Sequence, residues 1–185
     1  MTKLDRVTSR VVCFTAENIN TDQIIPARFL KRIDKSGFGT DLFADMKPAE
    51  VFGLADARQR QIMLCGTNFG CGSSREHAVW ALRDFGFRVL ISTAFADIFK
   101  ENSLKNGVLT ITLEPAAHQQ LVNAWQKNPD TEMTVDLEKQ SIAFAGLSIS
   151  FTVNSFNRTC LLEGLDELGY ILRYQKEIKA FEAAR

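Results

Sequence analysis

The stretch QIMLCGTNFGCGSSREHAVWALRDFG, residues 61–86, joins a short apolar run, a glycine-rich turn and an amphipathic helical pattern. Gln61 to Cys65 predicts a buried strand, and the turn GTNFGCG follows it directly. From Ser73 onward apolar residues recur with helical spacing, and Gly86 is a typical helix stop. A strand that passes through a glycine turn into a helix is typical of a βαβ unit. This stretch therefore predicts an α/β fold with parallel strands.

Strands and helices continue to alternate on both sides of this stretch. Downstream we expect a strand at 88–92, a helix at 96–106, a strand at 108–113, and a helix at 115–127 with Pro115 in its first turn. Upstream we expect a strand at 9–15, a surface loop over the polar, glycine-containing residues 33–43, and a weak helix at 47–60.

The pattern changes after residue 130. Residues 131–137 and 141–153 alternate apolar and polar side chains with a period of two, which predicts antiparallel hairpin strands. The tail, 160–184, is predicted to form two short helices broken near Gly169. We therefore expect one domain over residues 1–185: a mixed α/β core, an added antiparallel hairpin layer and a C-terminal helical tail.

Charge and hydropathy argue against several classes of protein. Lys plus Arg equals Asp plus Glu at 22 each, so the chain has no excess of positive charge of the kind that nucleic-acid-binding domains carry. The apolar runs are far shorter than the ~20 residues that span a bilayer. Charges at Lys3, Asp5, Arg6 and Arg10 interrupt the stretch where a signal peptide would be apolar. We expect a cytoplasmic protein with neither nucleic acid nor membrane as a partner.

The four cysteines are scattered along the chain. Cys65 and Cys71 are the only close pair, and their spacing matches neither zinc motifs nor iron–sulfur motifs. We therefore expect reduced structural thiols and no metal site in this chain, with a metal or redox site as the less favoured alternative.

The glycine turn and the residues after it predict an anion site. Glycines let the backbone approach a ligand closely, and a helix start offers unpaired N–H groups. Ser73 and Ser74 add hydroxyls, and Arg75 adds a planar fork that suits a carboxylate or phosphate. The stretch is neither a Walker A loop, a dinucleotide fingerprint nor a nucleophile elbow. The simpler alternative is that a serine only caps the helix while Arg75 is solvated.

Four further residues are assigned from the sequence, at or outside this site. Donors around Ser73 would favour its alkoxide, so the serine could exchange a proton beside a carboxylate bound by Arg75. His77, four residues beyond Ser73, suggests a Ser–His relay on one helical face, although it could equally line the helix. His118 is expected on a helix surface. The segment NINTDQIIP, 18–26, either forms an Asx turn or brings Asp22 to the same mouth as Arg75.

Four motifs carry a resemblance to a known family. They are NINTDQIIPARFL at 18–30, NFGCGSSREHAVWAL at 68–82, FADIFKENSLKNGVL at 95–109 and RTCLLEGLDELG at 158–169. With them the chain resembles the isopropylmalate isomerase small-subunit family of the aconitase superfamily over essentially its whole length. Cys71, where aconitases tend to carry Glu, is similar to the isopropylmalate branch. The resemblance implies a three-layer β/β/α swivel domain that pairs with a separate large subunit.

The resemblance also implies an activity and a set of roles. The reaction would interconvert 2-isopropylmalate and 3-isopropylmalate by dehydration and rehydration, in leucine biosynthesis. The large subunit would hold a 4Fe-4S cluster, and this chain would hold no cofactor. By position, the implied catalytic base is Ser73, and the implied ligands of the dicarboxylate substrate are Ser74, Arg75 and Asp22. Weaker candidates for substrate binding are Arg28, Lys31 and Arg32, and the implied supporting residues are Gly70, Gly72 and His77.

Two alternatives remain open at this point. A small subunit of homoaconitase or of a related dicarboxylate hydratase would differ chiefly in what the 27–40 loop contacts. A non-catalytic anion-binding module would use the same turn without any chemistry. For the catalytic readings, removal of a hydroxyl needs a metal as Lewis acid, and two His and four dispersed Cys do not provide its ligands. Half of the active site would then come from another chain.

Overall fold

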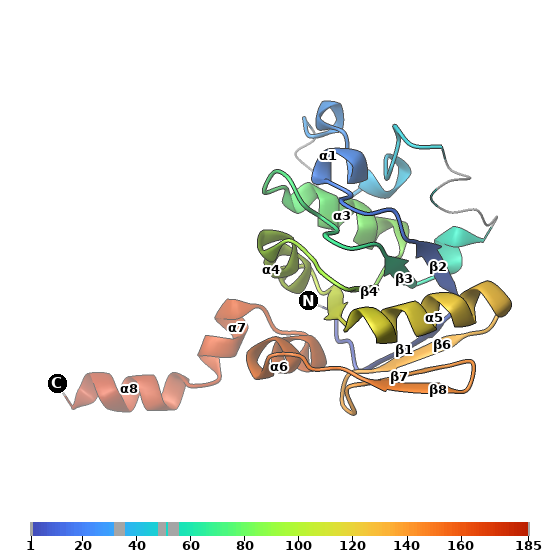
Figure 1. Ribbon diagram of the computed structural model, residues 1–185. Coiled ribbons are helices and arrows are strands. Elements are labelled where there is room, and N and C mark those ends of the chain that lie inside the picture. Colours follow the sequence, from blue (N-terminus) through green and yellow to red (C-terminus); the bar gives the residue numbers. More distant parts are fainter. Residues whose placement is uncertain (1, 32–35, 48–50, 52–55, 185) are drawn as a thin grey trace.

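The computed structural model describes residues 2–31, 36–47, 51 and 56–184, and it contains two four-stranded sheets (Figure 1). The parallel sheet has the order β2-β3-β4-β5, with bounds Val11–Phe14, Ile62–Cys65, Val89–Ser92 and Leu109–Thr112. Every residue of β3 and β4 is buried, because both faces of the sheet are covered. The predicted strands at these positions are confirmed.

One face of the parallel sheet is covered by α1 (Thr21–Ile24), α3 (Glu76–Phe85) and α4 (Asp97–Lys105). The core on this side contains Val12, Met63 and Leu90 from alternate positions of three strands. The opposite face, with Val11, Ile62 and Ile91, packs against α5 (Pro115–Lys127) and against the antiparallel sheet. The α/β class and the added antiparallel layer are therefore confirmed.

The antiparallel sheet has the order β1-β6-β7-β8, with bounds Arg6–Ser9, Met133–Asp136, Ser141–Phe144 and Leu147–Ser150. The hairpin strands were expected, but 141–153 is divided by a turn at Ala145 and Gly146, where φ is 47° and 84°. Strand β1 was not expected. It carries two buried and two exposed residues, RVTS, too few to show a period of two clearly.

The tail forms three helices where two were expected: α6 (Ser155–Glu163), α7 (Glu167–Leu172) and α8 (Gln175–Ala183). The first break lies at Gly164, which has a φ of 71°. Gly169 is inside α7, because its N–H donates to the Oδ1 of the N-cap Asp166 at 2.7 Å. The prediction of a break near Gly169 is therefore wrong.

The polar stretch 33–43 also differs from the surface loop expected. Its described residues include η2 (Phe38–Thr40), which packs on α3, and Phe38 and Phe43 are 0% and 2% exposed. Gly39 fits because its N–H donates to the Asp84 carboxylate at 2.8 Å, and an added Cβ would lie 2.6 Å from the Phe85 nitrogen. The weak helix expected at 47–60 falls largely on 48–50 and 52–55, outside the described residues, before η3 (Ala57–Gln59).

Candidate functional site

The loops that follow β2, β3 and β4 meet at the carboxyl edge of the parallel sheet. The N–H of Asn18 donates to the carbonyl of Thr67 at 2.9 Å, and the N–H of Gly70 donates to that of Ile19 at 2.8 Å. On the other side, Phe69 exchanges backbone hydrogen bonds with Ala94 and Ala96, each of 3.2 Å. The glycine turn thus lies between its two neighbours. In open α/β sheets this edge is where ligands bind.

Two glycines give the turn its shape. Gly70 and Gly72 have φ values of 78° and 88°, in the left-handed region that favours glycine. At Gly70 space is a second requirement, because an added Cβ would lie 2.2 Å from the Phe99 ring. The turn therefore rests directly on α4 at Gly70. The supporting role expected of Gly70 and Gly72 stays a prediction.

The helix after the turn begins later than expected. Helix α3 starts at Glu76, and its N-cap is Arg75, in an extended conformation and without a side-chain cap. Ser73 and Ser74 precede the helix, so neither serine is its N-cap and the simple capping interpretation is wrong.

The same boundary removes the basis for a Ser73–His77 relay, because the two residues do not share a helical face. The His77 ring instead lies with its centroid 4.4 Å from that of Trp80 and 5.4 Å from that of Phe38. Burial against these neighbours lowers the pKa of His77. The His77 ring therefore packs against the aromatic rings of Trp80 and Phe38.

Ser73, Ser74 and Arg75 line a pocket of about 260 Å³ together with the start of α4. The Arg75 side chain is 19% exposed, and its Nη1 donates to Oδ1 of Asp22. Asp22 is thus brought to the mouth that contains Arg75. The other lining residues are Thr21, Gly70, Gly72, Ala96, Asp97, Ile98, Phe99 and Asn102.

Segment 18–26 forms a helix cap in place of the Asx turn considered, and it also brings Asp22 to Arg75. Asn20 is the N-cap of α1, and its side chain accepts from the N–H of Gln23 at 2.9 Å. The Gln23 side chain accepts in return from the N–H of Asn20 at 2.9 Å, which completes a capping box. Asp22 lies in the first turn of this helix, two positions after the cap.

The weaker candidates lie away from this pocket. Arg28, in η1 (Ala27–Phe29), is exposed and makes two hydrogen bonds to Asp45, of 2.8 and 2.5 Å. Lys31 is exposed, and Arg32 lies outside the described residues. Among the described residues that line the pocket, neither Arg28 nor Lys31 occurs.

Sequence reasoning missed Thr21, Ile98 and Asn102, because an ordinary polar or apolar residue carries no motif and only the fold brings it to the turn. It also misplaced His118, which is 7% exposed on the buried side of α5. Burial lowers the pKa of His118.

The cysteines do not fit a metal cluster. Cys13 and Cys65 lie on adjacent strands in the core, and burial raises the pKa of Cys13 to about 11 and that of Cys65 well above its ordinary value. Metals bind the thiolate, which these surroundings disfavour. Within the described residues no three His, Cys, Asp or Glu side chains could together hold a metal ion, and no helix is long and apolar enough to cross a membrane.

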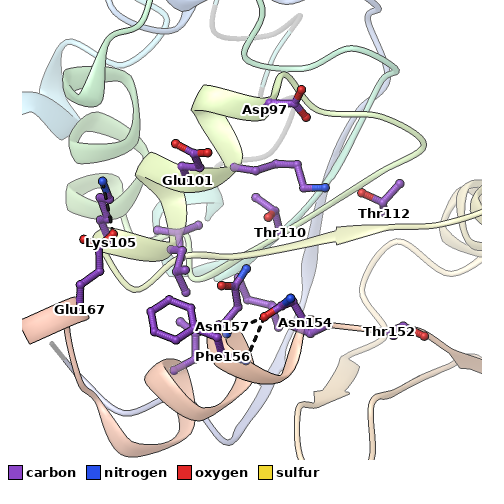
Figure 2. A pocket seen from close by; sticks show the side chains of 16 residues that line it. Asp97, Glu101, Lys105, Thr110, Thr112, Thr152, Asn154, Phe156, Asn157 and Glu167 are labelled. Atoms are coloured by element: carbon purple, nitrogen blue, oxygen red, sulfur yellow. Dashed lines mark hydrogen bonds and ion pairs between the residues drawn. The ribbon is translucent and has the colours of Figure 1, made fainter. Parts of the chain in front are cut away.

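A larger cavity, of about 710 Å³, lies between α4, β5 and the start of α6 (Figure 2). Its lining mixes acidic side chains with lysines, and Lys105 is paired with Glu167 at 3.4 Å. Among the described residues that line the two cavities, only Asp97 is shared with the pocket of Arg75. Because Ser73, Ser74 and Arg75 do not line this cavity, we place the candidate site in the smaller pocket.

Comparison with known proteins shows the family. The aconitase C-terminal domain family matches residues 1–116. The chain is 46% identical to the 3-isopropylmalate dehydratase small subunit of Herpetosiphon aurantiacus, over 100% of this chain and 95% of that protein. It is 47% identical to the small subunit of Acidobacterium capsulatum, over 98% of this chain and 85% of that protein.

A solved structure shows the same fold. It is a 3-isopropylmalate dehydratase from Methanocaldococcus jannaschii, with a TM-score of 0.70 and 24% identity over 96% of this chain and 99% of that one. The fold is thus of the aconitase swivel type, and the chain belongs to the family of 3-isopropylmalate dehydratase small subunits.

Proposed function

We propose that this chain is the small subunit of a hydro-lyase that interconverts 2-isopropylmalate and 3-isopropylmalate by dehydration and rehydration, in leucine biosynthesis. The observation that carries the proposal is the pocket in which Arg75, bonded to Asp22, lies beside Ser73 and Ser74. Small subunits of this name are 46% and 47% identical to the chain. We further propose that residues 1–185 work as one swivel domain with a helical tail. Its cytoplasmic location stays a prediction.

In this proposal Arg75 binds a carboxylate of the substrate. A guanidinium offers two parallel N–H donors to a carboxylate, which fixes the neighbouring carbon in orientation as well as distance. Asp22 keeps the Arg75 fork in the pocket before the substrate arrives. Ser74 adds a hydroxyl donor to the same carboxylate. Ser73 takes the carbon-bound proton during dehydration and returns it during rehydration.

Loss of the substrate hydroxyl requires a second group. A metal centre acts as a Lewis acid on such an oxygen, and among the residues that the structure describes no group of His, Cys, Asp or Glu could hold one. We propose that a 4Fe-4S cluster in the large subunit supplies this chemistry. The pocket of Arg75 is then the face that the large subunit covers, and this chain contributes the proton-transfer half of the site.

Co-purification with the large subunit tests the proposal. The complex is expected to dehydrate 3-isopropylmalate, whereas the isolated chain is expected to be inactive and to contain no stoichiometric iron or labile sulfide. An iron–sulfur cluster or dehydratase activity on the isolated chain would overturn the proposal that the large subunit holds the cluster and this chain only transfers the proton. A preference for homocitrate-type substrates would favour homoaconitase, and carboxylate binding without turnover in the complex would favour a binding module.

A further inference from the structure

Thr21 connects α1 to both sides of Gly72. It is 2% exposed, although it lies beside a pocket open to solvent. Its N–H donates to the carbonyl of Cys71 at 2.9 Å, and its Oγ1 donates to the carbonyl of Ser73 at 3.0 Å. Thr21 therefore bonds the backbone carbonyl groups of both Cys71 and Ser73, the residues on either side of Gly72.

Because peptide bonds are planar, these two hydrogen bonds also determine where the neighbouring N–H groups point. In a planar trans peptide the C=O and the following N–H point in opposite directions. Because the carbonyls of Cys71 and Ser73 point toward Thr21, the N–H groups of Gly72 and Ser74 point away from it. Within the described part of the chain, neither N–H donates a hydrogen bond to another residue. Both N–H groups can therefore donate to a ligand, and they lie on the segment that carries Ser73.

We propose that Thr21 is a positioning residue for this segment: it fixes the direction of the Gly72 and Ser74 N–H groups and the place of Ser73 in the pocket. The inference rests on the function proposed above and extends it by one residue that acts through the backbone of Ser73. The hydroxyl is the decisive group, because the backbone N–H at this position can donate to Cys71 with any side chain except that of proline.

Two variants separate positioning from packing. Thr21→Val keeps the shape of the buried side chain and removes the donor to Ser73, whereas Thr21→Ser keeps the donor and removes a methyl group. In the reconstituted complex, we expect Thr21→Val to lower kcat about 10- to 100-fold, since misplacement of a reacting group by about an ångström can cost on the order of a hundredfold. Thr21→Ser should stay near the wild-type kcat, and KM should change little in either variant.

The outcome that overturns the inference is a Thr21→Val complex with the kcat of an active wild-type complex. Equal losses of kcat in both variants would also overturn it, because packing would then explain the effect. Melting temperature and subunit pairing are measured on the same samples, so that kcat refers to folded complex.

A second readout does not depend on activity. In NMR spectra of the isolated chain, the amide signals of Gly72 and Ser74 should move in Thr21→Val and stay near the wild-type positions in Thr21→Ser. Unchanged amide signals in Thr21→Val would contradict the positioning role even if the wild-type complex proved inactive. An inactive wild-type complex would by itself overturn the proposed function, and the amide signals would then decide the role of Thr21.

Discussion

Arg75 and Asp22 are 53 positions apart in the chain, and the side chains meet only because the loops after β2 and β3 run side by side. The motif around Arg75 was sufficient to predict an anion site, because its residue types are unusual together. Asp22 stayed ambiguous, because an acidic residue in a polar turn has a simpler local role. Contact with Arg75 is a property of the fold, which spacing along the chain does not encode.

The planar guanidinium group of Arg75 gives a prediction about a single residue. Arg75→Lys keeps the charge but replaces two parallel donors with a point charge on a flexible stem. We expect kcat/KM of the reconstituted complex to fall roughly a hundredfold, because the bound carboxylate can swing. Arg6→Lys, at another ion pair in β1, is the matched control and should change kcat/KM little. Wild-type kinetics in Arg75→Lys would move the assignment toward the loop that contains Arg28 and Lys31.

Gly70 gives a second prediction, about stability. Gly70→Ala must adopt a positive φ and place its Cβ 2.2 Å from the Phe99 ring. Gly146→Ala is a matched control, because its φ of 84° is similar and nothing lies within 4 Å of its Cβ. We expect Gly146→Ala to cost about 1–2 kcal/mol from the left-handed backbone alone, and Gly70→Ala to cost about 2–5 kcal/mol because overpacking adds to it. Urea unfolding of the isolated chain measures both, and equal costs would contradict the close packing on α4.

At the scale of elements, the sequence predicted correctly those helix and strand bounds that depend on neighbouring residues in the chain. Helix α5 was placed at its observed bounds, because Pro115 favours the first turn and nothing else competes. Helix α3 was started three residues early, because Ser73 resembles a cap in sequence, whereas in the fold its carbonyl accepts from Thr21, 52 positions away, and the helix begins at Glu76. Phe38 and β1 were missed for the same reason: their burial depends on partners distant in sequence.

Strand β1 pairs with β6 through Arg6 and Asp136, which gives a prediction about pH. The N–H of Lys139 and the Arg6 guanidinium lower the pKa of Asp136. Because the folded value lies below the unfolded one, near 3.9, this carboxylate stabilises the fold above about pH 4 and loses that contribution as the pH falls through the folded value. Asp136→Asn should therefore destabilise the chain at pH 7, and its difference from wild type should shrink on acidification.

Urea unfolding at pH 7 and pH 3 tests this prediction. Glu132→Gln, at an exposed carboxylate next to β6, is the control and should have little effect at either pH. A destabilisation by Asp136→Asn that is as large at pH 3 as at pH 7 would show that the charge is not the cause.

At the scale of the whole molecule, the parallel sheet directs three loops to one edge, and the antiparallel sheet and α5 support it from the opposite face. The resulting pocket brings Arg75 beside Ser73 and Ser74, and among the residues that the structure describes no group of His, Cys, Asp or Glu side chains could hold a metal ion. In the function proposed above, this pocket is half of an active site that the large subunit completes. The central claim is that Ser73 is the base of this half.

The most direct test adds increasing amounts of the chain to a fixed amount of large subunit and measures isopropylmalate dehydration. Wild-type chain should restore activity until the two are stoichiometric. Ser73→Ala should pair equally well and displace the wild-type chain, yet give a rate at least about a hundredfold lower, as loss of a general base commonly does. A Ser73→Ala complex that turns over at nearly the wild-type rate would contradict the account.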